Sequence, residues 1–218
     1  MRMKRVLLAV LILFLSAIAT SALGYSQYIP RGRVAPGIYA IRNYNNGLPF
    51  VNFFLVQTGQ SYIAFDAGSD SAQTEIALQR LDISPDDVIA VFVTHDDADH
   101  IGSLELFANA NIYKWPMMYD GEIIEAYGVS IQAFHTPGHT SGCMTYLVDG
   151  RHLFVGDLMV NPNFARYDSQ LQIANREMML AMDGVESVFT GHFGLVRRVE
   201  FFRWWLGVHT ISTCENPV

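Results

Sequence analysis

Six consecutive positions, His95–His100, hold two histidines and three aspartates, and only Thr94 separates them from the apolar run Val88–Val93. In an extended chain residues i and i+2 point to the same side, so His95, Asp97 and Asp99 can converge before the chain turns. A surface cluster of charges is the alternative, but crowded carboxylates repel one another unless a cation lies among them. The segment therefore predicts a metal site at the end of a strand.

Three further side chains of the same kinds occupy similar places later in the chain. Each lies in a glycine-marked loop in or just beyond an apolar stretch: His139 in Thr136–Thr140, Asp157 after Leu153–Gly156, and His192 after Val188–Gly191. A single histidine beside a glycine is more often a turn residue or a hydrogen-bonded structural histidine. Repeated placement after strand-like runs instead predicts ligands that gather at one edge of a sheet.

In their order along the chain, these residues resemble the signature of the metallo-β-lactamase superfamily of metallo-hydrolases, over about residues 37–196. That signature is HxHxDH, followed by a distant histidine, an aspartate and a final histidine. The Asp66–Gly68 turn and the stretch Thr136–Asp157 match the superfamily as well. Carried over by position, the resemblance implies two divalent metal ions with these ligands: His95, Asp97 and His139 for the first, Asp99, His100 and His192 for the second, and Asp157 bridging both.

One position departs from the superfamily's pattern, because Asp97 stands where a second histidine is usual. Carboxylate oxygen is a harder ligand than imidazole, so the first site should favour iron or manganese more than an all-histidine site does. Zinc is the metal that the superfamily implies, and carboxylates also bind it. The metallo-β-lactamase-like part of bacterial DNA-uptake channel proteins often reads HxDxDH, and the segment Thr94–Gly102 resembles it. Asp96, between the ligands, is expected to face solvent or to support them.

The resemblance implies hydrolysis by a water shared between the two cations, with Asp99 and Asp157 as catalytic carboxylates as well as ligands. Two divalent cations lower the pKa of such a water and polarise the oxygen of the bond under attack. A small molecule with a carboxylic ester, lactone or amide bond, such as a β-lactam, is the first expectation. Phosphodiester cleavage and a non-catalytic metal-binding module are the alternatives. Phe164 and Tyr167 follow the bridging aspartate and are expected to border the substrate.

Composition is consistent with a single hydrolase domain, expected over residues 25–218. Of the 218 residues, 50% are hydrophobic and 16% are charged, which is typical of a globular chain. The formal net charge of −7 argues against a nucleic-acid partner, because phosphate binding usually needs a surface rich in lysine and arginine.

Residues 1–24 predict an export signal. A basic start, an apolar stretch and a small-residue cleavage site follow one another: Met1–Arg5, Val6–Ile18 and Ala22–Gly24 before Tyr25. An uncleaved membrane anchor is the alternative, since residues 6–24 are just long enough to span a bilayer. Either way the domain is expected in the periplasm or outside the cell, which permits a disulfide between Cys143 and Cys214.

Periodicity predicts a mixed α and β domain, and the resemblance implies an αββα sandwich of two mixed sheets with helices on the outer faces. The expected strands are Gly37–Ile41, Val51–Gln57, Tyr62–Asp66, Val88–Thr94, Asn111–Lys114, Val129–His135, Cys143–Val148, His152–Val155 and Val188–Thr190. The expected helices are Ser71–Leu81, Gly102–Ala108 and Asp168–Met182. Hairpin turns are expected at Asn45–Gly47 and Asp149–Gly150.

Overall fold

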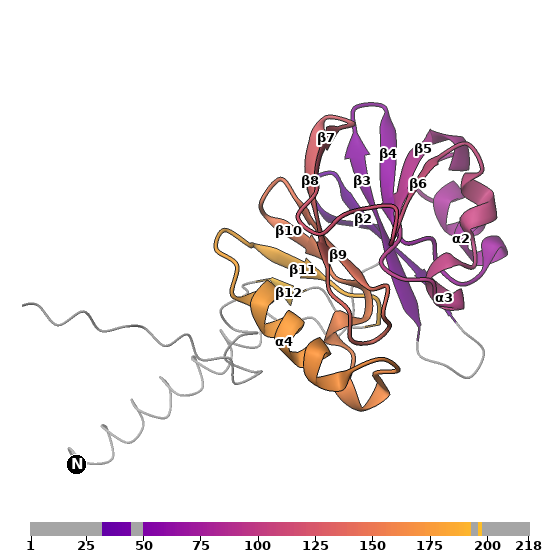
Figure 1. The fold of residues 1–218 in the computed structure, drawn as a ribbon. Helices are drawn as coiled ribbons and strands as arrows, with labels where there is room; N and C mark the ends of the chain where they lie inside the picture. The colour runs from indigo at the N-terminus through magenta and orange to yellow at the C-terminus, as the bar shows by residue number, and fades with distance from the viewer. Residues whose placement is uncertain (1–31, 45–49, 193–195, 198–218) are drawn as a thin grey trace, which may run out of the picture.

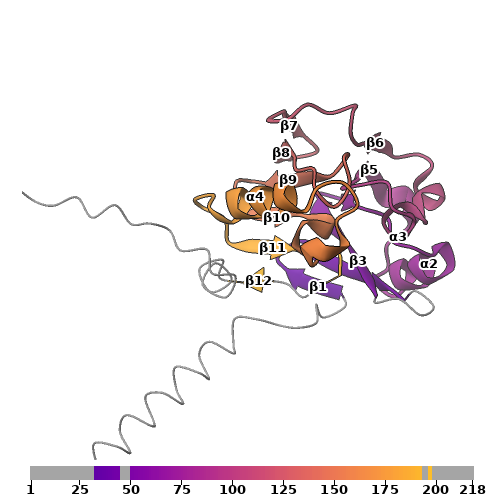
Figure 2. The ribbon, with the colours of Figure 1, turned by 60° about the horizontal axis from the view of Figure 1, so that its bottom comes forward.

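The computed structural model describes residues 32–44, 50–192 and 196–197, which form a sandwich of two six-stranded sheets. Helices α2 (Ser71–Gln79) and α3 (Ala98–Ile101) lie beside the first sheet, and α4 (Ser169–Leu180) lies beside the second (Figure 1). Figure 2 shows α2 and α4 on opposite sides of the sandwich. The expected sandwich of two mixed sheets with outer helices is therefore confirmed.

The strands of the first sheet lie in the order in which they occur along the chain. They are β1 (Gly32–Ala35), β2 (Ile38–Asn43), β3 (Val51–Thr58), β4 (Ser61–Phe65), β5 (Val88–Phe92) and β6 (Asn111–Tyr113). Pairing is antiparallel from β1 to β4 and parallel from β4 to β6. Because β4 and β5 are parallel, their carboxyl ends lie at the same edge of the sheet, where Asp66 and Thr94 follow them.

The second sheet has the strand order β12-β11-β10-β9-β8-β7. Its strands are β7 (Ile123–Ala126), β8 (Val129–His135), β9 (Met144–Val148), β10 (His152–Phe154), β11 (Ser187–Phe189) and β12 (Val196–Arg197). β9 is antiparallel to both β8 and β10, and β10 is parallel to β11, so β8, β10 and β11 run in one direction. Their carboxyl ends therefore share one edge, and each is followed by a predicted ligand loop.

Both longer helices begin at an aspartate whose side chain caps the first turn. The Asp70 carboxylate accepts the N–H of Gln73 at 2.8 Å, and the Asp168 carboxylate accepts those of Gln170 and Leu171 at 2.9 Å. Such caps satisfy N–H groups that have no partner within the helix. Both starts agree with the sequence prediction, and both helices end two residues before their predicted ends.

The helix predicted over Gly102–Ala108 is wrong. The helix lies earlier, at α3, and only the short 3-10 turn η2 (Leu104–Phe107) follows it. At Gly102 the backbone passes so close to the β4–α2 connection that a Cβ atom would lie 2.5 Å from the Ser69 carbonyl oxygen. This crossing comes where the predicted helix would begin. Three other short 3-10 turns are η1 (Pro85–Asp87), η3 (Gly156–Met159) and η4 (Pro162–Phe164).

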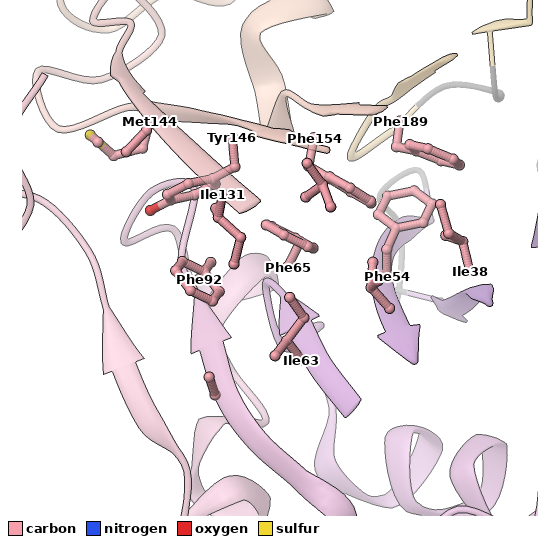
Figure 3. Close-up of a cluster of buried hydrophobic side chains, with 14 of the residues drawn as sticks. Ile38, Phe54, Ile63, Phe65, Phe92, Ile131, Met144, Tyr146, Phe154 and Phe189 are labelled. Atoms are coloured by element: carbon pink, nitrogen blue, oxygen red, sulfur yellow. The ribbon is translucent and has the colours of Figure 1, made fainter. Parts of the chain in front are cut away.

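Aromatic rings from both sheets fill the space between them (Figure 3). Phe65 of the first sheet stacks on Phe154 of the second, with ring centroids 3.9 Å apart and an angle of 7° between the rings. Phe154 also stacks on Phe189 at 4.7 Å. The hydroxyl of buried Tyr146 donates to the Val93 carbonyl oxygen at 2.8 Å. The core therefore holds the second sheet against the end of β5, just before the segment His95–His100.

Several sequence predictions concern residues outside the described part of the chain. They are the export segment 1–24, the turn at Asn45–Gly47, and Cys214. Cys143 is buried, and the N–H of Thr140 donates to its Sγ at 3.2 Å. Its pairing with Cys214 therefore stays a prediction. Among the described residues, no helix is long and apolar enough to cross a membrane.

Candidate metal centre

Four separate loops bring histidines and aspartates together at the shared edge of the two sheets. The loop after β5 carries His95–His100, and the β8–β9 loop carries His139. Asp157 lies in η3 after β10, and His192 follows β11 by three residues. The N–H of Met144 donates to the Thr94 carbonyl oxygen at 2.7 Å, which joins the two sheets beside these loops.

His95, Asp97 and His139 form one group whose ligand atoms all lie within 4.8 Å of one another. Asp97 Oδ2 lies 3.2 Å from His95 Nε2 and 3.1 Å from His139 Nε2. Both histidines are buried, whereas the Asp97 side chain is 20% exposed. These are the three residues that the resemblance assigned to the first metal.

A second group contains Asp99, His100 and His192, the residues assigned to the second metal. Asp99 Oδ2 lies 3.3 Å from His192 Nε2. The prediction that Asp99 would point with Asp97 from an extended chain is wrong, because α3 begins at residue 98. Helical geometry turns Asp99 and His100 away from the direction of Asp97 and toward the loop after β11. The two groups are thus separated by the start of a helix.

Asp157 lies between the two groups and faces all four imidazoles. Its Oδ2 is 3.9 Å from His95 Nε2, 3.5 Å from His139 Nε2 and 3.3 Å from His192 Nε2. Its Oδ1 is 3.3 Å from His100 Nε2. Of the residues that the structure describes, no other carboxylate contacts both groups. This is the position that a bridging ligand needs.

The carboxylates strongly favour positive charge at this centre. Burial lowers the pKa of His192, but hydrogen bonds to Asp157 and Asp99 outweigh it and raise that pKa to about 10. Burial also opposes the charged form of His100, yet Asp157 and Asp66 hold its pKa well above the ordinary value. Burial would raise the pKa of Asp157, but His100 and His192 keep it well below its usual range.

Several buried polar atoms at the centre have no hydrogen-bond partner among the described residues. They include Nε2 of His95, Nε2 of His100 and Oδ1 of Asp157. Unpaired polar atoms are rare in protein interiors and call for a ligand, water or ion. Imidazole nitrogens and carboxylate oxygens are ligands for zinc, iron and manganese. The donor set therefore fits divalent cations.

Asp66 orients the centre from beneath, a role that the sequence analysis missed because it treated this residue only as part of a turn. Its Oδ2 accepts the Nδ1–H of His100 at 2.7 Å and the hydroxyl of Thr94 at 2.8 Å. Its Oδ1 accepts the N–H of Thr94 at 2.7 Å. His192 is oriented similarly, since its Nδ1 lies 2.9 Å from the Phe50 carbonyl oxygen. Both contacts leave Nε2 free to face the centre, as in other carboxylate-supported histidine ligands.

Replacing Asp66 with asparagine is expected to weaken metal binding by roughly 10–100-fold, because loss of such a supporting carboxylate makes the imidazole a poorer ligand. Competition with a chelator would measure the affinity. D70N is a matched control, since Asp70 is exposed and asparagine caps a helix as well as aspartate does. Equal affinities for D66N and D70N would contradict the supporting role.

Arg166 is a second residue that the sequence analysis did not identify. Its Nη2 donates to Asp97 Oδ1, across 69 residues of sequence. By contrast, Asp96 is exposed and pairs with Lys114 at 2.9 Å, so it points away from the centre. Phe164 and Tyr167 lie in the same segment as Arg166 and are 66% and 60% exposed. Their predicted place beside the substrate stays a prediction.

The sandwich of two mixed sheets gathers histidine and aspartate side chains that could hold metal ions at one edge. Comparisons with known proteins agree with this fold. A family model described as "Metallo-beta-lactamase superfamily" matches residues 46–122. A metallo-β-lactamase family protein from Thermus thermophilus has the same fold, with a TM-score of 0.62 at 19% identity over 81% of this chain and 80% of that chain. Residues 46–122 therefore match the metallo-β-lactamase superfamily, and the described part of the chain has the fold of a member of that superfamily.

Several curated relatives are named as hydrolytic enzymes. A hydroxyacylglutathione hydrolase from Aeromonas hydrophila is 29% identical over 113 residues, covering 44% of this chain and 43% of the relative. An atrochrysone carboxyl ACP thioesterase from Pseudocercospora fijiensis is 27% identical over 142 residues, covering 57% of this chain and 43% of the relative. The chain spans less than half the length of the curated relatives that it matches.

Proposed function

We propose that this protein is a dinuclear metallo-hydrolase that cleaves a carboxylic ester, lactone or amide bond in a small molecule. The observation that carries the proposal is the position of Asp157, whose carboxylate faces four imidazoles from two three-residue groups. Zinc is the metal expected from the superfamily, and Asp97 would also suit iron or manganese.

In this proposal His95, Asp97 and His139 hold one cation, Asp99, His100 and His192 hold the other, and Asp157 joins them. Two cations bound here would lower the pKa of a shared water and polarise the carbonyl oxygen of the substrate. Asp157 is nearly buried, whereas the Asp99 side chain is 25% exposed. Asp99 is therefore the carboxylate better placed to take the proton that the attacking water releases. Asp157 would hold the two groups at a constant separation.

Acyl substrates are placed first because curated relatives include proteins that are named for acyl hydrolysis. Phosphodiester cleavage is the second candidate, favoured by the HxDxDH sequence of the metal loop. The net charge of −7 disfavours nucleic acid as its substrate. A metal-binding module without catalysis is the third candidate.

A panel of chromogenic carboxylic esters, a lactone, a β-lactam and a phosphodiester would test the proposal on the purified protein. We expect turnover of acyl substrates that is lost with a chelator and regained with Zn²⁺, Mn²⁺ or Fe²⁺. Turnover of the phosphodiester alone would favour the second candidate. Bound metal without any turnover would favour the binding module.

We also propose that Phe164 and Tyr167 contact the acyl part of the substrate. F164A and Y167A should each raise KM for a long-chain ester roughly tenfold, because burying a side chain of this size contributes about 1.5–3 kcal/mol. KM for an acetyl ester and kcat for both esters should change little. Ile76, an exposed apolar residue of α2, supplies the control variant I76A. Equal KM values for F164A, Y167A and I76A would contradict this placement.

The basic and apolar pattern of residues 1–24 supports the further proposal that the protein is exported. Cell fractionation and N-terminal sequencing of the recovered protein would test it. A mature chain that starts at Tyr25 indicates cleavage of a signal. A membrane-bound chain that keeps residues 6–24 indicates an anchor instead.

A further inference from the structure

The two oxygens of Asp97 serve different neighbours. Oδ2 faces His95 Nε2 at 3.2 Å and His139 Nε2 at 3.1 Å, which is the direction of the proposed first cation. Oδ1 faces the other way and accepts a hydrogen bond from Arg166 Nη2. A carboxylate held in this way presents one oxygen to the cation, as an imidazole would present one nitrogen.

The backbone that carries Arg166 is attached to the loop that carries His139. The N–H of Arg166 donates to the His139 carbonyl oxygen at 2.9 Å, and the N–H of Asp168 donates to the Gly138 carbonyl oxygen at 3.0 Å. Gly138 lies against α4 so closely that a Cβ atom would be 2.4 Å from Gln172 Cα. The position of Arg166 relative to the first group is therefore set by the main chain, even though its side chain is 58% exposed.

The contact between Arg166 and Asp97 changes the net charge around the first cation. The superfamily's HxHxDH pattern would supply three neutral imidazoles to the first cation, whereas Asp97 adds one negative charge. The guanidinium of Arg166 adds one positive charge at hydrogen-bonding distance from it. Arginine keeps this charge at any physiological pH, and its planar donor groups suit a carboxylate.

We propose that Asp97 and Arg166 act as a coupled pair that takes the place of the superfamily's second histidine. In this pair Arg166 is a positioning residue: it directs one oxygen of Asp97 toward the first cation and cancels the charge that Asp97 adds. The inference rests on the proposed metal binding and explains how the first position tolerates a carboxylate.

The pair makes a specific prediction about restoring the histidine. In D97H the guanidinium of Arg166 has lost its carboxylate and repels the cation, so binding at the first position should weaken at least about tenfold. The R166Q change should then recover most of that loss in the double variant D97H/R166Q. In the wild-type background R166Q should give no such gain, because there it also releases Asp97. Coupling between two residues in contact is the expected behaviour of such a pair.

Stepwise titration of the metal-free protein with Co²⁺ would test the coupling, with affinity from calorimetry and ligand geometry from the visible absorption of bound Co²⁺. The first-position band should be lost or shifted in D97H and regained with a histidine-type spectrum in D97H/R166Q. R151Q is the matched control, because Arg151 makes two hydrogen bonds to Glu186 in an exposed pair that shares no residue with the centre. D97H/R151Q should bind Co²⁺ as weakly as D97H does.

The possible outcomes distinguish a failure of the proposed Asp97–Arg166 pair from a failure of the proposed metallo-hydrolase function. Two Co²⁺ ions bound by the wild type, with the same effect of R166Q in both backgrounds, would overturn the pair and leave the metallo-hydrolase proposal standing. A folded wild type that binds no Co²⁺ would overturn both. Thermal melting of each variant shows whether it is folded before its affinity is compared.

Discussion

Replacing Asp157 with alanine is expected to reduce the metal content from about two ions per chain to one or none, and to abolish hydrolysis. Asp157 alone among the described carboxylates faces the Nε2 atoms of His95, His100, His139 and His192. Without it, two cations would share no side-chain ligand, and less negative charge would offset their mutual repulsion in a buried centre.

Elemental analysis of protein purified without added metal, together with turnover of the ester panel, would measure this effect. The H95A variant should behave differently. It removes one side chain of the first group and leaves Asp99, His100 and His192 intact. We therefore expect about one ion per chain in H95A. D183A is the control, since Asp183 is exposed and belongs to neither group. A D157A protein that keeps two ions would show that the bridging assignment is wrong.

Replacing Phe154 with alanine is expected to lower the free energy of unfolding by about 3–5 kcal/mol, which corresponds to roughly 10 °C in melting temperature. Phe154 is 1% exposed and lies between Phe65 and Phe189, so its removal leaves a cavity between the sheets. Rigid neighbours on both sides limit how far the cavity can collapse, and the cost of such a substitution rises with the cavity that remains.

Urea unfolding in the presence of a chelator would measure this change without a contribution from metal binding. F164A is the matched control, because it removes the same ring from a residue that is 66% exposed. Its effect should stay within about 0.5 kcal/mol. A comparable loss in both variants would contradict the view that the aromatic stack holds the two sheets together.

Much of the fold was predictable from local patterns. Strands β3, β4, β5, β8 and β9 lie where apolar or alternating runs predicted them. Among the strands of four residues or fewer, β6, β10 and β11 were predicted and β1, β7 and β12 were not, because runs this short carry too little periodicity to be recognised consistently. The helix misplaced at Gly102–Ala108 shows the same limit, since the interruption comes from a close approach to Ser69, distant in sequence.

The members of the centre were predictable for a different reason. The segment His95–His100 comes after a buried strand, and His139, Asp157 and His192 each follow a glycine in a loop after a strand, so the sheets bring them to one edge. The division of these residues into two groups depended on the resemblance, and the structure shows that the start of α3 separates Asp97 from Asp99. Local pattern had predicted that the two side chains would point the same way.

The sequence by itself determined which kinds of side chain form the candidate centre, because these residue types and their places after strands are local properties of the chain. Only the tertiary structure decided how those ligands are supported. Asp66 reaches His100 across 34 residues, and Arg166 reaches Asp97 across 69. No local spacing encodes such contacts, because they depend on which loops the packed sheets bring together. They also depend on whether a charged side chain of one loop meets the opposite charge in another loop.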